Sequence, residues 1–231
     1  MIAETCQELL VLFRQDVHDY GSYAVAQDDS DKLWKDSEIL GYMTESCDAL
    51  ARATYGLREI ARIGYAAGDE TVELPAHILD IISARLMTNN SRMVASNADD
   101  AGAPVNDYGV VHERRDLFTA TGIPCEYVRD YDVGMLRLVP IPNVADTLEL
   151  SCYVTVENPL EAEDDVPFLA AVDLRLVLEY MKFIAYRKQD VETEDLVRSK
   201  MAKAFYDEGS MERRYEIQRQ RRTPGVMRMA D

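Results

Sequence analysis

The stretch that decides the fold class reads TLELSCYVTVENPLEAEDDVP and covers residues 147–167. Polar and apolar side chains alternate over 147–156, and this period of two is typical of a β-strand with one buried face. An acidic connector, Glu161–Asp165, follows the strand. Pro167 then suits the first turn of a helix, because the N–H that proline lacks would have no partner there. The stretch therefore marks the exit from a β region into a helical region.

Helical periodicity continues on the C-terminal side. The helix predicted over 167–187 is apolar on more than one side, so we expect it to form the core of the fold. Leu176 and Phe183 are expected to be buried against an N-terminal helix predicted over 37–55. A final helix is expected to end near Gly209, after which the sequence becomes polar and rich in arginine. Its predicted apolar stripe consists of Val197, Met201, Ala204 and Phe205.

Two helices are also predicted on the N-terminal side. The first covers residues 4–20, and a polar stretch over 21–32 predicts an exposed loop. The second begins at Asp36 or Ser37, because either side chain can accept a hydrogen bond from a free N–H of the first turn. Trp34 lies just before this helix, and we interpret it as a packing anchor under the helix start.

Strands are predicted between the two pairs of helices. Residues 57–160 contain short alternating runs and turn residues, which is the pattern of a β region. Pro140 and Pro142 end one of these runs, since proline has no N–H for a ladder. The best candidate strands cover 71–74, 78–87, 126–130, 135–139 and 147–156, and a long loop is predicted at 97–118.

The order of the elements predicts an α+β protein. We expect a four-helix bundle formed by the N- and C-terminal helices, with an antiparallel β subdomain inserted between them. The predicted divisions are 1–56 for the N-terminal helices, 57–160 for the β subdomain, 161–208 for the C-terminal helices and 209–231 for a basic C-terminal arm.

The composition is strongly acidic, with 42 Asp and Glu against 25 Lys and Arg and a net charge of −17 at pH 7. Such a chain repels nucleic acid and anionic membranes at long range, which argues against a non-specific DNA binder. Residues 211–231 differ, because they hold six arginines and three carboxylates. This segment is either a solvated helix end with a frayed terminus or a docking arm for an acidic partner.

No catalytic constellation emerges from the sequence. The His112-Glu113 pair lacks the second histidine of a zinc-peptidase motif, and no glycine-rich phosphate loop occurs. The connector Glu161–Asp165 lacks the ligand pattern of a calcium loop. The four cysteines are interpreted as core thiols in a reducing compartment. We therefore expect no enzymatic turnover, no metal and no cofactor, and we find no pattern of a signal peptide or a membrane span.

Several short motifs follow one another along the chain. Residues 34–40 (WKDSEIL) resemble a helix start of phage head-to-tail adaptors, and residues 73–81 (ELPAHILDI) resemble the Leu-Pro segment of these proteins, although the tyrosine usual before it is Val72 here. Further similar segments are 121–127 (TGIPCEY), 136–142 (LRLVPIP) and 165–167 (DVP). The chain thus resembles head-to-tail adaptor, or connector, proteins of the tail tubular protein A type.

The resemblance implies a structural virion protein in the neck of a tailed bacteriophage, made in the host cytoplasm. It implies a homo-oligomeric ring, a dodecamer, between the portal protein and the tail or nozzle protein. Double-stranded DNA would pass through the lumen during packaging and ejection without sequence-specific binding, and no membrane would be involved. Portal contacts are expected on the C-terminal arm, at Arg213, Arg214, Arg221, Arg222, Met227 and Met229.

Two other functions fit the same features. A tail-completion or stopper protein of the same neck would touch different neighbours. An acidic regulator that mimics DNA would place its carboxylates in phosphate-like rows and bind a basic nuclease or repressor. An adaptor, unlike the regulator, is expected to form a ring with the portal.

Overall fold

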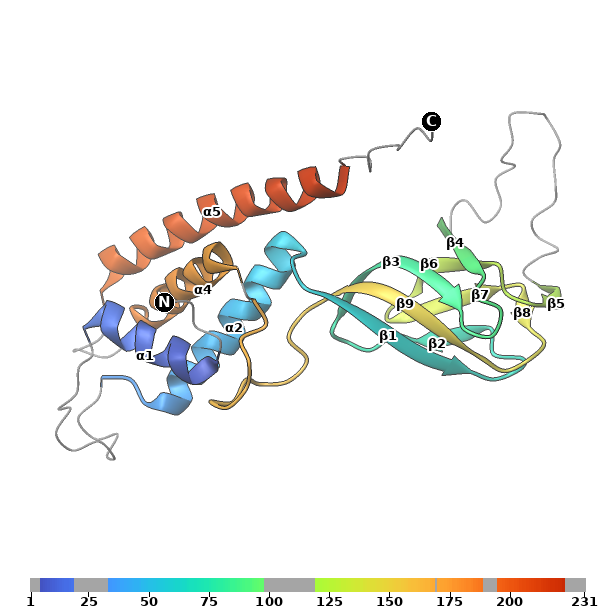
Figure 1. The fold of residues 1–231 in the computed structure, drawn as a ribbon, viewed down its shortest axis with the longest axis horizontal. Coiled ribbons are helices and arrows are strands. Elements are labelled where there is room, and N and C mark those ends of the chain that lie inside the picture. Colours follow the sequence, from blue (N-terminus) through green and yellow to red (C-terminus); the bar gives the residue numbers. More distant parts are fainter. Residues whose placement is uncertain (1–4, 19–32, 98–118, 169, 189–194, 223–231) are drawn as a thin grey trace, which may run out of the picture. The chain divides into compact units, whose positions relative to one another are not determined.

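The computed structural model describes residues 5–18, 33–97, 119–168, 170–188 and 195–222. The chain divides into two compact units, which we call the helical unit (residues 1–57 and 155–231) and the β unit (residues 58–154) (Figure 1). Residues 155–160, which the sequence prediction placed in the β subdomain, lie in the helical unit. The predicted loop at 21–32 and almost all of the one at 97–118 lie outside the described residues.

The described part of the helical unit contains α1 (Cys6–Val17), α2 (Asp36–Thr54), α4 (Ala171–Ala185) and α5 (Leu196–Arg222). Helices α2 and α4 each contact the other three described helices, and the contacts of α4 with α5 and α2 are the most extensive (Figure 1). Together with the sheet described below, these helices make an α+β protein. A regular four-helix bundle stays a prediction.

The first two helices begin with side-chain caps. The Thr5 hydroxyl accepts the backbone N–H of Glu8 at 3.3 Å and caps α1. Helix α2 begins differently from the prediction, because Asp36 and Ser37 already lie inside its first turn. The Glu38 carboxylate instead reaches back and accepts the N–H of Lys35 at 3.0 Å. A carboxylate at this end also interacts favourably with the helix dipole, so it replaces the predicted cap.

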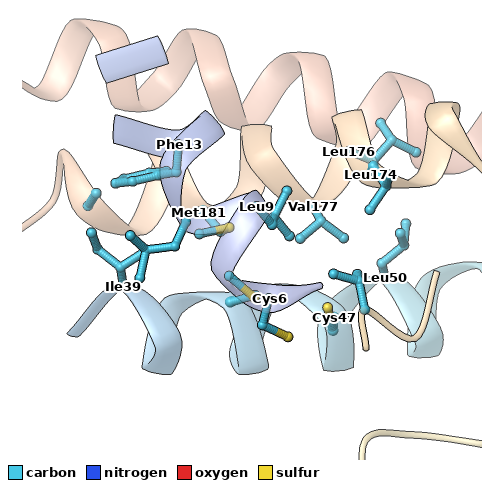
Figure 2. Packing of buried hydrophobic residues seen from close by; sticks show 14 of the residues in the cluster. Cys6, Leu9, Phe13, Ile39, Cys47, Leu50, Leu174, Leu176, Val177 and Met181 are labelled. Carbon is cyan, nitrogen blue, oxygen red and sulfur yellow. The ribbon is translucent and has the colours of Figure 1, made fainter. Parts of the chain in front are cut away.

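The core of the helical unit lies where α1, α2 and α4 meet (Figure 2). Its fully buried side chains come from all three helices, and they include Leu9, Phe13, Ile39, Leu50, Val177 and Met181. Trp34 packs edge-on against Phe13 and Tyr186, with ring centroids 6.0 and 6.2 Å apart. This confirms its interpretation as a packing anchor, since aromatic edges and faces attract each other in this geometry.

The predictions for α4 are partly corrected. The helix begins at Ala171 rather than at Pro167, and Val166 and Phe168 are buried in the segment that precedes it. Leu176 is buried as expected, whereas Phe183 is only half-buried. The core therefore uses one side of α4 more fully than the sequence pattern indicated.

The prediction for α5 is wrong in two respects. The helix does not end near Gly209 but continues to Arg222. The predicted apolar stripe also faces solvent, with Val197 70% and Met201 68% exposed. The inward face is formed by the smaller or more polar side chains Ser199, Ala202, Tyr206 and Ser210. Small residues on this face let α5 lie close to α4, so hydrophobicity alone indicated the wrong side of the helix.

At Gly209, helix α5 lies very close to helix α4. A Cβ atom added there would lie 2.5 Å from Cδ2 of the buried Leu176. We expect Gly209→Ala to lower the free energy of unfolding by about 1–3 kcal/mol, because overpacking outweighs the better helix propensity of alanine. Gly41 in α2 is the matched control, since nothing lies within 4 Å of its added Cβ. Gly41→Ala should stabilise the protein by about 0.5–1 kcal/mol in urea unfolding. Equal effects of the two substitutions would contradict the close contact.

The β unit contains strands that the sequence predicted and others that it did not single out. The described strands are β1 (Arg58–Tyr65), β2 (Thr71–Glu73), β3 (Ile78–Leu86), β4 (Arg92–Asn97), β5 (Thr121–Gly122), β6 (Glu126–Asp132), β7 (Met135–Val139), β8 (Ile141–Pro142) and β9 (Asp146–Val154). Seven of them form one sheet in the order β1-β9-β3-β4-β6-β7-β2, and β5 pairs with β8. The buried side chains of the large sheet include Leu136, Leu138, Leu148 and Leu150.

The prediction of an antiparallel subdomain is wrong at two strand pairings, one of which is the parallel pairing of the short strands β5 and β8. Strands β4 and β6 pair in parallel, with Val94 opposite Glu126 and Ser96 opposite Val128. Parallel neighbours need a long crossover connection, and residues 98–125 between the two strands are long enough to supply it. The large sheet is therefore mixed.

Candidate docking surfaces

The described residues offer little for catalysis. No group of three or more His, Cys, Asp or Glu that could hold a metal ion occurs among them. Burial raises the pKa of the Cys47 thiol to about 12 and that of Cys6 to about 11, which keeps both protonated and poorly nucleophilic. Cys125 is exposed, so its assignment to the core was wrong, whereas Cys152 is buried. No helix in this part of the chain is long and apolar enough to cross a membrane.

One groove of about 810 Å³ lies in the β unit beside β2, β3 and the β6–β7 hairpin. Its lining contains no Ser, Thr, Cys, His or Lys, so it holds no side chain of the common nucleophile or base types other than carboxylates. The Arg129 guanidinium lies 2.8 Å from the Asp80 carboxylate and neutralises it. The exposed surfaces of each unit are therefore the candidate docking sites.

The basic part of α5 is bound to its own chain. Arg213 donates from Nε and from a terminal nitrogen to the two carboxylate oxygens of Asp173 in α4, at 2.7 and 2.9 Å. It also lies 3.1 Å from Glu216. The hydrogen bond that Arg213 donates to Asp173 is the main cause that raises the pKa of Arg213, which stays charged. This predicted portal residue therefore attaches α5 to α4.

Two more of the predicted portal residues contact the end of α2. Arg214 lies over the Tyr55 ring, 5.6 Å from its centroid, and Arg221 donates to the Tyr55 carbonyl at 2.8 Å. Residues 211–222 thus continue α5 and contact the rest of the helical unit, whereas the predicted division at residue 209 placed them in a separate arm. The Arg222 side chain, Met227 and Met229 lie outside the described residues.

The opposite side of α5 forms a regular exposed stripe, which we call the α5 seam. It consists of Val197, Met201, Ala204, Glu208, Met211 and Tyr215. These positions alternate in spacing between four and three residues, which is the heptad pattern of a helix that packs along another helix. Met211 is 59% exposed and Tyr215 is 65% exposed, so most of the seam is apolar surface without cover from the described residues. The seam therefore has the shape and chemistry of a helix-docking surface.

A second surface covers the outer face of strands β1, β9, β3 and β4. We call it the arginine face, and it carries Arg58, Ile60, Arg62, Arg85, Arg92 and Glu149. The strand register places these residues together, because Arg62 and Arg85 flank Glu149 on the central strand β9. Ile60, Arg85, Arg92 and Glu149 line one shallow groove of about 590 Å³.

Glu149 is enclosed by the arginines of this face and is only 7% exposed. Arg85 donates to it from Nε at 2.7 Å, and Arg62 donates from Nε at 3.1 Å. The hydrogen bond from Arg85, followed by that from Arg62, holds the pKa of Glu149 below its ordinary value of 4.5. The charge of the central carboxylate of the arginine face is thus compensated within the sheet.

This pKa shift predicts a pH-dependent contribution to stability. Because the pKa of Glu149 is lower in the folded state, its stabilising effect is complete above pH 4.5 and is lost as the pH falls through the folded-state value. We expect Glu149→Gln to lower the melting temperature at pH 7 and to make a much smaller difference at pH 3. Thermal unfolding of both proteins at both pH values checks this. An equal difference at the two pH values would contradict the two-arginine clamp.

The arginine face was not predicted from the sequence. The alternation Arg58, Ile60, Arg62 was visible in the sequence, but strand β1 was not singled out there. Arg85 and Arg92 join the face only through the pairing of β3 with β4 and β9, which a single sequence does not reveal. A search for arginines at every second position of predicted strands would have found part of it.

Comparison with known proteins agrees with the adaptor class that the motifs indicated. The model of the SU10 adaptor protein family matches residues 5–229. A comparison with curated proteins finds no match. The finer assignment to the tail tubular protein A type stays a prediction.

The family match spans both units, including the whole of α1 and α5 as well as every strand of the sheet. It therefore covers the fold and both candidate docking surfaces rather than one motif. The chain belongs to the SU10 adaptor protein family.

Proposed function

We propose that this protein is the head-to-tail adaptor of a tailed bacteriophage, a structural virion protein that forms a ring between the portal and the tail. The observation that carries the proposal is the family match over residues 5–229. In this role the ring continues the DNA channel and presents the surface to which the tail or nozzle attaches. The net charge of −17 suits a channel wall that must not retain DNA.

The C-terminal part of the chain is the proposed portal-binding element. The intrachain contacts of Arg213, Arg214 and Arg221 hold α5 in place, and the α5 seam then faces outward along the helix. An exposed heptad stripe fits an apolar stripe on a partner helix through interlocking side chains. Residues 222–231, with Arg222, Met227 and Met229, extend this element and are proposed to complete the contact. We propose a helix of the portal protein as the partner of the seam.

The experiment compares binding to purified portal rings in a sedimentation assay. The double substitution Met211→Asp and Tyr215→Asp should abolish binding while leaving the melting temperature nearly unchanged, because both side chains are exposed. Val144→Asp is the matched control, since Val144 is 64% exposed in the β unit, and it should bind normally. Normal binding of the double variant would show that the seam is not the portal contact.

Two truncations distinguish the packing of α5 within the chain from its binding to the portal. Deleting residues 223–231 should preserve the melting temperature and weaken portal binding. Deleting residues 211–231 also removes the contacts of Arg213 with Asp173 and of Arg221 with the Tyr55 carbonyl, so it should lower the melting temperature as well. If the longer deletion unfolds at the wild-type temperature, the described packing of α5 does not stabilise the chain.

A further inference from the structure

The arginine face is a basic, partly apolar surface on a strongly acidic protein. Four arginines, at 58, 62, 85 and 92, share this face with Glu149 at its centre, and the strand register places Asp80 and Glu126 at its margins, where Asp80 is paired with Arg129. Glu149 is nearly buried and is already paired with two of them. All four arginines are exposed, so the surface that a partner meets is positive. On the next strand, β6, Glu126 accepts a hydrogen bond from Ser96 at 2.9 Å and bounds the face.

Apolar side chains lie between the arginines. Ile60 is 62% exposed and lies between Arg58 and Arg62 on β1, and Val94 is 61% exposed two residues beyond Arg92 on β4. Binding to a nucleic-acid backbone uses cationic and polar groups, and exposed isoleucine and valine contribute nothing to phosphate contacts. Arginine combined with apolar residues is instead typical of the core of protein–protein interfaces. The composition therefore favours an acidic protein partner.

The same chain carries a surface of the opposite charge. The acidic connector, Glu161–Asp165, exposes four carboxylates within five residues. Its main chain is held in place, because the N–H groups of Cys6 and Gln7 donate to the carbonyls of Asp164 and Ala162 at 2.9 and 3.0 Å. None of the ion pairs found among the described residues involves these four carboxylates. One oxygen of the Asp164 carboxylate accepts the N–H of Glu161 at 2.7 Å, which also holds the connector in shape. The exposed carboxylates of the connector thus form an anchored acidic surface that can meet an external cation.

We propose that the arginine face of one copy binds the acidic connector of a second copy. Guanidinium groups bind carboxylates with two parallel hydrogen bonds, so such a contact has direction as well as charge complementarity. Because the two surfaces differ, the contact is heterologous, and repetition of a heterologous contact builds a ring when the rotation closes. The proposal rests on the proposed ring-forming function and names the contact between neighbouring copies.

The first experiment detects the contact without the portal. Ile60→Cys and Glu163→Cys are made in separate full-length chains that both carry Cys125→Ser, which removes the exposed native thiol. Oxidation of the mixture at high protein concentration should give a disulfide-linked heterodimer, whereas each variant alone should give far less dimer. If the mixture gives no more dimer than the separate variants, the proposal is overturned.

The second experiment uses charge reversal. Arg58→Glu with Arg92→Glu forms the face variant, and Glu161→Arg with Glu163→Arg forms the connector variant. Each should reduce the copies assembled on portal rings by more than about tenfold, because reversed charges repel across the contact. The chain with all four substitutions should assemble again. Arg52→Glu with Arg187→Glu is the matched control, since it changes the net charge equally at exposed positions of the helical unit and should assemble normally.

The results distinguish a failure of the proposed contact between copies from a failure of the proposed adaptor function. Normal assembly of the face variant, or failure of the four substitutions to restore assembly, overturns the pairing. If the face variant assembles normally but loses affinity for double-stranded DNA, the face binds nucleic acid instead. If wild-type protein does not bind portal rings although the cysteine pair forms heterodimers, the proposed function fails and the contact between copies stands.

Discussion

Replacing Leu176 by alanine is expected to lower the free energy of unfolding by about 2–5 kcal/mol. The side chain is 2% exposed and lies between α4 and α5, where Gly209 leaves room for it. Removing it loses the burial of the side chain and leaves a cavity that the close helix contact cannot readily fill. Urea unfolding followed by far-UV circular dichroism measures the effect.

Phe183 in the same helix provides the comparison. It is half-buried, and its ring packs edge-on against Tyr180 with centroids 5.3 Å apart. We expect Phe183→Ala to cost only about 1 kcal/mol, because much of its surface is already hydrated in the folded state. In addition, Gly209→Ala should become harmless once Leu176 is alanine, since the overlapping methyl group is gone. Additive effects of these two substitutions would contradict the contact between them.

Replacing Asp173 by alanine should produce the second large loss of stability. The Asp173 carboxylate is nearly buried and accepts two hydrogen bonds from Arg213, whose side chain is 19% exposed. Its removal leaves a largely desolvated guanidinium without its main partner. We expect a loss of about 2–3 kcal/mol, below the cost of breaking a fully buried pair because Arg213 retains some contact with water.

The exposed pair of Arg52 with Asp48 in α2 is the control for this substitution. Its atoms lie 2.8 Å apart, but the two side chains are 58% and 34% exposed. Asp48→Ala should therefore change the free energy of unfolding by no more than about 0.5 kcal/mol. If Asp173→Ala is equally mild in chemical denaturation, the ion pair does not hold α5 against α4.

The periodicity of the sequence predicted that the four described helices exist, and it predicted five of the nine described strands. Helix α2 and strand β9 have strong patterns of period 3.6 and period 2, and these two elements end within two residues of the predicted positions. The motifs also indicated the adaptor class, which the match over residues 5–229 bears out. These features depend on local pattern or on the order of motifs, so one sequence contains them.

The predictions that were wrong concern features that depend on contacts between residues far apart in the sequence. The stripe of Val197 and Met201 was expected to face inward, yet the inner face of α5 is formed around Ala202 and Gly209, where close approach of the helices matters more than hydrophobicity. Likewise, Arg213 was assigned to a partner because its pairing with Asp173, forty positions away, leaves no local signal. The parallel pairing of β4 with β6 is equally non-local.

The central claim is that this chain is a ring-forming adaptor that binds the portal. Electron microscopy of purified portal particles mixed with the full-length protein tests it most directly. The proposal predicts an added ring of density on one end of the portal, with the same rotational symmetry along the channel axis. Bare portal particles in the presence of excess folded protein would contradict it.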